Sequence, residues 1–407
     1  DNGTYSYDNV QFLNNINAGY EVLKNFRIKF SGGINYQAFE EWSIRPNTIY
    51  NPAYASGQSS FYSQSNTSDY KKFSYILEPQ LNWQFRKGNH QLDVLVGATY
   101  QQDVIRVGSL RGSGFESNAF IQNMAAAQIK TVGDQINTEY RYTAIFGRIN
   151  YQLSEKYILN ITGRRDGSSR FGPNNKFANF AAAGAAWLFS EENFLKDLKW
   201  LSFGKLRGSF GTSGSDHIGD YQYLNTFSIS SASIYNGVTG IIPSRLYNPD
   251  FSWEKTTKAE IAIELGMFKN RLNMTAAYYR NRSSNQLVGY QLSAVTGFSS
   301  VNANLNATVQ NIGFEVDTQF KALTSSTLKW DIGFNVSIPR NRLLSFPGLE
   351  GSTYANTYMI GQPVNIVKLY HLQGINQQTG EYQFTDYNGD GKITSPQDRQ
   401  VIENLGV

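Results

Sequence analysis

Apolar and polar residues alternate along most of this chain with a period of two. In the segment 328–338, six apolar side chains share one face of an extended strand, and polar or small side chains share the other. The same alternation runs through 72–85, 90–100, 259–268 and 311–320. A helix would repeat every 3.6 residues, so the pattern predicts long β-strands with one apolar and one polar face.

Short turns and long polar segments alternate between these predicted strands. The turns lie at 23–25, 86–89, 154–156, 268–271 and 323–327, with a longer link at 190–203. The polar segments, which we expect to be loops, occupy 38–70, 103–138, 165–177, 212–254, 283–308 and 339 onward. The pattern therefore predicts about twelve strands in about six hairpins.

Long loops at every second connection are typical of a transmembrane β-barrel. Such a barrel has short periplasmic turns, long extracellular loops and strands that face lipid and lumen alternately. Aromatic residues near the expected strand ends fit an interfacial girdle or an ordinary core. They are Tyr100, Tyr151, Tyr157 and Tyr279. We predict an all-β fold, an antiparallel transmembrane β-barrel in contact with outer-membrane lipid.

Twelve strands alone would not close such a barrel, because two bare strand edges would lie in lipid. The chain begins within a strand pattern at Asp1 and ends in a loop at Val407. We therefore expect residues 1–407 to be a single, partial barrel domain of a larger protein that continues on both sides.

Composition excludes several other classes of protein. Hydrophobic residues make up 40% of the chain and the mean hydropathy is −0.42, so no run approaches the ~20 apolar residues of a membrane helix. The 26 Tyr and 26 Phe argue against disorder. Without cysteine there is no disulfide scaffold or thiolate metal site. The net charge is only +4 and no cluster of Lys and Arg stands out, so the sequence lacks the basic surface that nucleic-acid binding requires.

Catalytic motifs are absent from the sequence. There is no G-x-S-x-G, phosphate-binding glycine loop or H-E-x-x-H, and His90, His217 and His371 are scattered. The carboxylates carry no pairing signature of a glycosidase. We predict no enzyme and no catalytic residues.

The stretch DYNGDGKITSPQDR, residues 386–399, has the opening of a calcium loop. Asp386, Asn388 and Asp390 fall at ligand positions 1, 3 and 5, and Gly391 makes the sharp turn. The carbonyl of Lys392 falls at position 7. These are oxygen ligands of the kind that calcium prefers.

The closing half of that loop departs from the calcium pattern. Position 12 is Gln397, and Asp398 lies one residue late. No helix pattern precedes the loop, so it is not a calcium sensor with two moving helices. We expect a rigid extracellular loop, held either by Asx-turn hydrogen bonds alone or by a structural calcium ion. The metal ligands would be Asp386, Asn388, Asp390, Lys392 and Asp398.

Aromatic and small polar residues mix in the expected loops 40–70 and 220–237. Aromatic faces and amides suit sugar rings and peptides, and they also let loops pack on each other. The candidate substrate contacts are Trp42, Tyr50, Tyr54, Tyr221 and Tyr235. In the segment 165–172, Arg165, Asp166 and Arg170 could contact a substrate or partner, or could form an internal Asp–Arg pairing that fastens a loop to the barrel wall. We favour the structural role, because paired charges in crowded loops usually serve structure.

Five segments, taken together and in order, resemble the SusC/RagA-type TonB-dependent outer-membrane transporters. The resemblance covers most of residues 140–402, whereas 1–139 are similar mainly in pattern. The segments are RRDGSSRFGPNNKFANFAAAGAAWLFSEENFL (164–195), KLRGSFGTSG (205–214), NPDFSWEKTTKAEIAIELGMF (248–268), QNIGFEVDTQF (310–320) and NGDGKITSPQDRQVI (388–402).

The resemblance implies a bacterial outer-membrane barrel of about 22 strands with a plug domain in its lumen. It also implies coupling to TonB, a SusD-like surface lipoprotein over the extracellular mouth, and import of oligosaccharides or peptides. Inward side chains would then line the lumen or contact the plug. They are Glu315, Asp317, Asp331 and Asn335. Two other functions stay open, a passive barrel or adhesin without TonB and a barrel-embedded enzyme.

Overall fold

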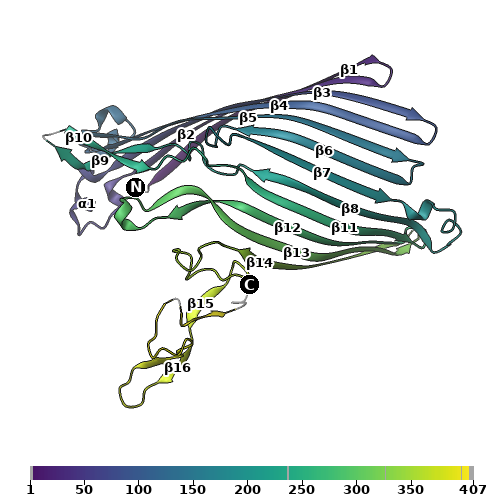
Figure 1. The fold of residues 1–407 in the computed structure, drawn as a ribbon. Helices are drawn as coiled ribbons and strands as arrows, with labels where there is room; N and C mark the ends of the chain where they lie inside the picture. The colour runs from purple at the N-terminus through teal and green to yellow at the C-terminus, as the bar shows by residue number, and fades with distance from the viewer. Residues whose placement is uncertain (1–2, 236–237, 326, 396, 403–407) are drawn as a thin grey trace. The chain divides into compact units, whose positions relative to one another are not determined.

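A computed structural model describes residues 3–235, 238–325, 327–395 and 397–402, without the side chains of 230–235, 239, 294 and 402. Among these residues, one 12-stranded sheet has the strand order β1-β2-β3-β4-β5-β6-β7-β8-β11-β12-β13-β14 (Figure 1). Each strand therefore neighbours the next one in sequence, except where β9 and β10 form a separate sheet. The predicted twelve strands are confirmed.

The strands of the main sheet are long. They are β1 (Thr4–Leu23), β2 (Phe26–Arg45), β3 (Gln64–Lys87), β4 (His90–Ser113), β5 (Ile129–Leu153), β6 (Tyr157–Ser168), β7 (Phe177–Trp187), β8 (Leu201–Ser215), β11 (Glu254–Met267), β12 (Leu272–Gln291), β13 (Ser300–Thr324) and β14 (Lys329–Ser345). The predicted turns fall at the junctions between them, and a short 3₁₀ helix, η5 (Phe189–Glu191), overlaps the start of the predicted link at 190–203. At 268–271, three turn residues adopt positive φ: Phe268, Lys269 and Asn270.

The expected loops are shorter than the sequence predicted, and this part of the prediction was wrong. Between β2 and β3 only 46–63 lies outside the strands, and between β12 and β13 only 292–299. The backbone continues its antiparallel hydrogen bonding beyond the apolar band. In β13 the alternation of apolar and polar residues also continues, at the odd positions from Val301 to Val309, so a strand signal was present in a segment that we predicted to be a loop.

The chain divides into two compact units. The first comprises 1–84, 94–147 and 165–170. In it, β1 pairs with β2 from Thr4–Ile44 to Leu23–Phe26, with a register shift after Glu21, and β2 pairs with β3 along its whole length. The loop segments contain short helices: η1 (Asn47–Ile49), α1 (Ala55–Gln58), η2 (Ser60–Tyr62), η3 (Asn118–Phe120) and η4 (Met124–Ala126).

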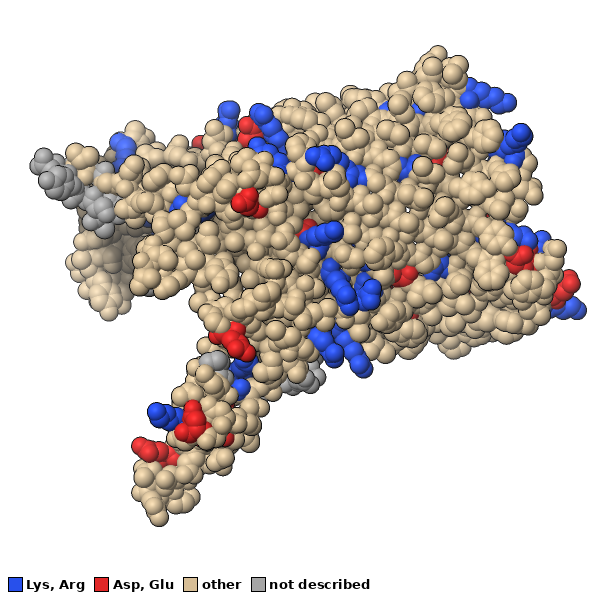
Figure 2. Space-filling model, in the orientation of Figure 1, with Lys and Arg blue, Asp and Glu red and all other residues tan. Residues whose placement is uncertain are grey.

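The second unit comprises 85–93, 148–164 and 171–407. Here Ile261, Tyr278, Phe314 and Ile338 lie side by side on β11, β12, β13 and β14. All four are about half exposed, at 45–54%. Most of the surface over the strands in view is uncharged (Figure 2). The predicted apolar face of these strands is thus confirmed.

Small sheets lie in segments that the sequence predicted to be loops. β9 (Thr226–Tyr235) pairs with β10 (Val238–Arg245) inside 212–254. Near the C-terminus, β15 (Val367–Tyr370) pairs with β18 (Arg399–Ile402), and β16 (Leu372–Ile375) with β17 (Tyr382–Phe384). The strands β15 to β18, of three or four residues each, are too short to show a clear period. Among the described residues, no helix is long and apolar enough to cross a membrane.

Candidate functional site

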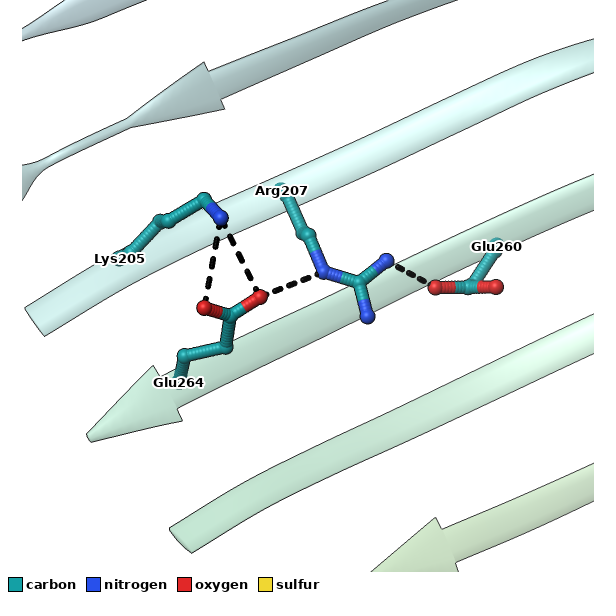
Figure 3. A network of polar contacts seen from close by, with 4 residues as sticks. All are labelled: Lys205, Arg207, Glu260 and Glu264. Atoms are coloured by element: carbon teal, nitrogen blue, oxygen red, sulfur yellow. Dashed lines mark hydrogen bonds and ion pairs between the residues drawn. The ribbon is translucent and has the colours of Figure 1, made fainter. Parts of the chain in front are cut away.

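The polar face of the second unit carries a four-residue charged network (Figure 3). Lys205 Nζ lies 3.3 Å from both oxygens of Glu264, and Arg207 Nε donates to Glu264 Oε1 at 2.8 Å. Arg207 also contacts Glu260. Lys205 and Arg207 come from β8, and the two glutamates come from β11. Two positive and two negative charges therefore balance across one strand pair.

Strand register explains why these charges meet. Lys205 lies opposite Glu264, and Leu206 lies opposite Ile263, which belongs to the apolar face. Because neighbours along a strand point to opposite faces, the charged residues share the polar face. The side chains of Lys205 and Glu264 are each 26% exposed. Charge-assisted hydrogen bonds of this kind fix side-chain geometry, so the network forms a preorganised polar wall.

The other predicted inward residues share that polar face. Glu315 lies opposite Ser337 and accepts a hydrogen bond from its hydroxyl at 3.2 Å. Asp317 lies opposite Asn335, and Asp331, four residues before Asn335 on β14, lies on the same face. Their common face is confirmed, whereas contact with a plug stays a prediction.

Three aromatic candidates lie in the first unit. Trp42 belongs to β2, not to a loop, and its Nε1 donates to Ser65 Oγ at 2.7 Å. Tyr50 directly follows η1, and Tyr54 directly precedes α1. Tyr54 is 68% exposed, so its ring is the most accessible of the three to a ligand.

A buried polar cluster holds the loop that carries Tyr50 and Tyr54. Ser63 Oγ accepts from the Asn47 N–H at 2.8 Å and donates to Asn118 Oδ1 at 2.6 Å. Asn118 Nδ2 in turn donates to Asn47 Oδ1 at 2.7 Å. The segments 46–63 and 114–128 are therefore joined, and Tyr54 projects from an ordered loop.

The remaining aromatic candidates are in the second unit. Tyr221 lies in the turn after β8 with φ of 58°, and its carbonyl accepts from Arg245 Nη1 at 3.2 Å. The side chain of Tyr235 lies outside the described residues. A role in substrate contact stays a prediction for all five aromatic residues.

The 386–398 loop is held by Asx-turn hydrogen bonds. Asp386 accepts the N–H groups of Gly389 and Gly391, each at 2.7 Å. Asn388 Oδ1 accepts from the Asp390 N–H at 3.0 Å, and Asp390 Oδ1 accepts from the Lys392 N–H at 2.8 Å. The predicted ligand positions therefore satisfy the turn's own backbone donors.

Asp398 closes this loop from a fully buried position. Its Oδ1 accepts the N–H of Tyr387 at 2.8 Å, and its Oδ2 accepts the N–H of Thr394 at 2.7 Å. The N–H of Thr394 is the main cause that lowers the pKa of the Asp398 carboxyl from its ordinary value. Asp398, which lies one residue after the usual last calcium ligand, thus joins the two ends of the turn.

The donor chemistry of this loop suits calcium only in part. Two carboxylates and an amide lie close together, but Asp398 points to backbone N–H groups. Among the described residues, no cluster of three or more His, Cys, Asp or Glu is arranged to hold a metal ion. Calcium binding stays a prediction.

The segment 165–172 is tied to β5. The guanidinium of Arg170 lies 4.2 Å from the ring centroid of Tyr140, and Asp166 is buried. Ser169 and Arg141 exchange two hydrogen bonds, at 2.9 Å each. These contacts fit the expected structural role, and the Asp–Arg pairing itself stays a prediction.

Sequence comparison identifies related proteins. Residues 1–400 match the family model described as "TonB dependent receptor-like, beta-barrel". TonB-dependent receptor P3 of Formosa agariphila is 29% identical over 417 residues, covering 95% of this chain and 41% of that protein. TonB-dependent receptor SusC of Bacteroides thetaiotaomicron is 27% identical over 411 residues, covering 94% of this chain and 40% of that protein. The chain thus spans about two fifths of these relatives.

Structural comparison agrees at the level of fold. The structure of the RagAB peptide transporter superposes with a TM-score of 0.86 and 22% identity. The match covers 98% of this chain and 44% of that chain. The 12-stranded sheet therefore has the fold of part of a larger transporter barrel.

Proposed function

This chain belongs to the TonB-dependent receptor-like β-barrel family, and we propose that it is the barrel of an importer that takes up oligosaccharides or peptides across the outer membrane. The family is one of outer-membrane transporters and not of enzymes. Energy would reach the barrel through a plug domain that binds TonB. A SusD-like lipoprotein would cover its extracellular mouth.

The alternation of faces along adjacent strands carries this proposal. Ile261, Tyr278, Phe314 and Ile338 form one apolar row suited to lipid. The opposite face presents carboxylates, amides and the Lys205–Glu264 network, which suit a water-filled or plugged lumen. A passive barrel shares this pattern, so the family match supports TonB coupling over that alternative.

Uptake by living cells tests the proposal. A strain lacking the gene would be complemented with the full-length protein and supplied with fluorescent oligosaccharides or peptides. We expect uptake of one substrate class that disappears when TonB is deleted or the membrane potential is dissipated. Uptake that persists without TonB would identify a passive barrel, and surface binding without uptake would identify an adhesin.

The partner is tested by purification. The full-length protein, extracted in mild detergent with an affinity tag, should bring down one surface lipoprotein at a fixed ratio. Deleting that lipoprotein should lower uptake at low substrate concentration. Unchanged uptake in the deletion strain would remove the lipoprotein from the mechanism and leave the TonB-dependent barrel in place.

A further inference from the structure

Four arginines lie on the outward face of the second unit, directly above its apolar band. Arg280 of β12 pairs in register with Ile312 of β13, which pairs with Arg340 of β14. Arg282 pairs with Gln310, which pairs with Arg342. We call Arg280, Arg282, Arg340 and Arg342 the arginine belt. Figure 2 shows basic side chains gathered over strands β12 to β14.

Strand parity places the belt on the lipid side. Arg280 is two residues from Tyr278, and Arg340 is two residues from Ile338. The register between these strands is unbroken here, so residues two apart share a face. The side chains between the arginines, on the inward face of the same strands, are uncharged. Asn341 of β14 donates a hydrogen bond to Asn311 of β13 at 2.7 Å.

The length of the apolar run locates the belt at the membrane boundary. From Leu328, just before β14, the outward apolar side chains extend along the strand to Ile338 and stop at Arg340. Ten residue steps span roughly 34 Å along a strand. A tilt of about 45° reduces this to roughly 24 Å, close to the ~25 Å height of a barrel's apolar band. Since the short turns mark the periplasmic end, the belt lies at the outer leaflet.

The belt lacks acidic partners. Within the part of the chain that the structure describes, none of its four arginines forms an ion pair with a carboxylate, and all four are exposed. Arg282 Nε donates to the neutral side chain of Gln310 at 2.8 Å, which orients one guanidinium. The outward residues beside them on β11, Ala259 and Thr257, carry no charge.

We propose that the arginine belt binds the phosphate groups of a phosphorylated lipid in the outer leaflet. The arginines of β12 and β14 are two strand spacings apart, about 10 Å, and the two arginines on each strand are two residues apart, about 7 Å. Guanidinium groups across such a rectangle can hold phosphate oxygens bidentately. The acyl chains would lie on the apolar row that begins with Tyr278, Phe314 and Ile338. Lipid is favoured over a protein because, on both β12 and β14, the belt occupies the next positions on the same face after the apolar row.

Lipid exchange tests this site. The full-length protein would be reconstituted in phosphatidylcholine nanodiscs that contain fluorescent lipid A, either bisphosphorylated or fully dephosphorylated. We expect tighter binding of the phosphorylated form, by roughly fivefold for each arginine that contributes. The quadruple Arg→Gln variant should abolish the preference, and the quadruple Arg→Lys variant should retain part of it.

Matched controls separate the belt from general charge. A variant with Lys24, Lys87, Lys199 and Lys269 changed to Gln loses the same charge from exposed positions in or next to the connections at the opposite end of the strands, and it should keep the preference. Circular dichroism would establish that each variant folds. Equal binding of the two lipids, or an unchanged preference in the quadruple Arg→Gln variant, would overturn the proposal.

Two further experiments test whether the arginine belt binds free phosphate or a protein instead of lipid. Inorganic phosphate at millimolar concentration should not displace the lipid, and displacement would identify a site for free phosphate instead. If the quadruple Arg→Gln variant lost a co-purifying protein while lipid binding was unchanged, the belt would be a protein-docking surface and the lipid proposal would be wrong.

Discussion

Asp398 and Thr394 are joined by three hydrogen bonds. The N–H and the hydroxyl of Thr394 donate to Asp398 Oδ2, at 2.7 and 3.3 Å, and the Asp398 N–H donates to the Thr394 carbonyl at 3.1 Å. The other oxygen of the same carboxylate accepts the N–H of Tyr387. A single buried side chain therefore spans the calcium-like loop from its start to its end.

We expect Asp398→Ala to open this loop while the barrel stays folded. The N–H groups of Tyr387 and Thr394 would lose a charged acceptor, and their hydrogen exchange should quicken by roughly tenfold or more. Exchange measured by mass spectrometry over 386–398 checks this. Gln397→Ala is the control, since the hydrogen bond that Gln397 accepts from Thr394 Oγ1 is long, at 3.5 Å. Equal exchange in the two variants would contradict the role of Asp398.

Calcium should add to these hydrogen bonds if the sequence pattern has its usual meaning. We expect calcium to slow exchange in 386–398 of the full-length protein and magnesium to do so less, because the loop offers several flexible oxygen ligands. Asp390→Ala should remove the effect. Loop exchange that is the same in calcium and in chelator would leave the Asx turns as the whole support.

The sequence predicted strand ends well where lipid imposes a pattern. The apolar run that begins at Leu328 marks the start of β14 at Lys329, and the predicted end of 259–268 lies one residue from the end of β11. The opposite ends were predicted poorly. β13 begins at Ser300, and its odd positions from Val301 to Val309 are apolar among polar neighbours. The apolar residues of 311–320 occupy even positions instead, and we predicted a loop where the pairing with β12 shows a strand.

The charged network illustrates a second limit. Parity alone places Glu260 and Glu264 opposite Ile261 and therefore on the polar face. Their partner Arg207 is 57 residues from Glu264, and the β9–β10 hairpin lies between them in sequence. Only the register of β8 against β11 brings the charges together, and no local pattern specifies that register.

Gly172→Ala should loosen the contact between two loops of the second unit. A Cβ at Gly172 would overlap the backbone carbonyl of Pro249, whereas a Cβ at Gly163 meets nothing within 4 Å. The Gly172 N–H also donates to Phe251 O at 3.0 Å. Such overpacking costs about 1–3 kcal/mol. We expect faster proteolysis of 169–176 and 248–253 on intact cells, and Gly163→Ala should behave as wild type. Equal proteolysis in both variants would show that the backbone yields.

Glu192 should make the β7–β8 link sensitive to acid. The carboxylate accepts from Tyr157 Oη at 2.6 Å, Trp187 Nε1 at 3.1 Å and Lys156 Nζ at 3.2 Å. These hydrogen bonds, that from Tyr157 first, lower the pKa of Glu192 to about 2 from its ordinary 4.5. Because the folded pKa is the lower one, the stabilisation is fully present above about pH 4.5 and is lost as the pH falls towards 2.

Glu192→Gln removes this titration and tests it. Denaturant unfolding of the full-length protein in detergent should show the variant less stable than wild type at neutral pH. The difference should shrink as the pH falls through the window from 4.5 to about 2, because the wild-type carboxylate is then protonated as well. Glu191→Gln is the matched control, since the ion pair of Glu191 with Lys196 is 3.7 Å long and about half exposed, and such pairs contribute little. A stability difference that stays constant across this window would mean that Glu192 acts through its shape and hydrogen bonds and not through its charge.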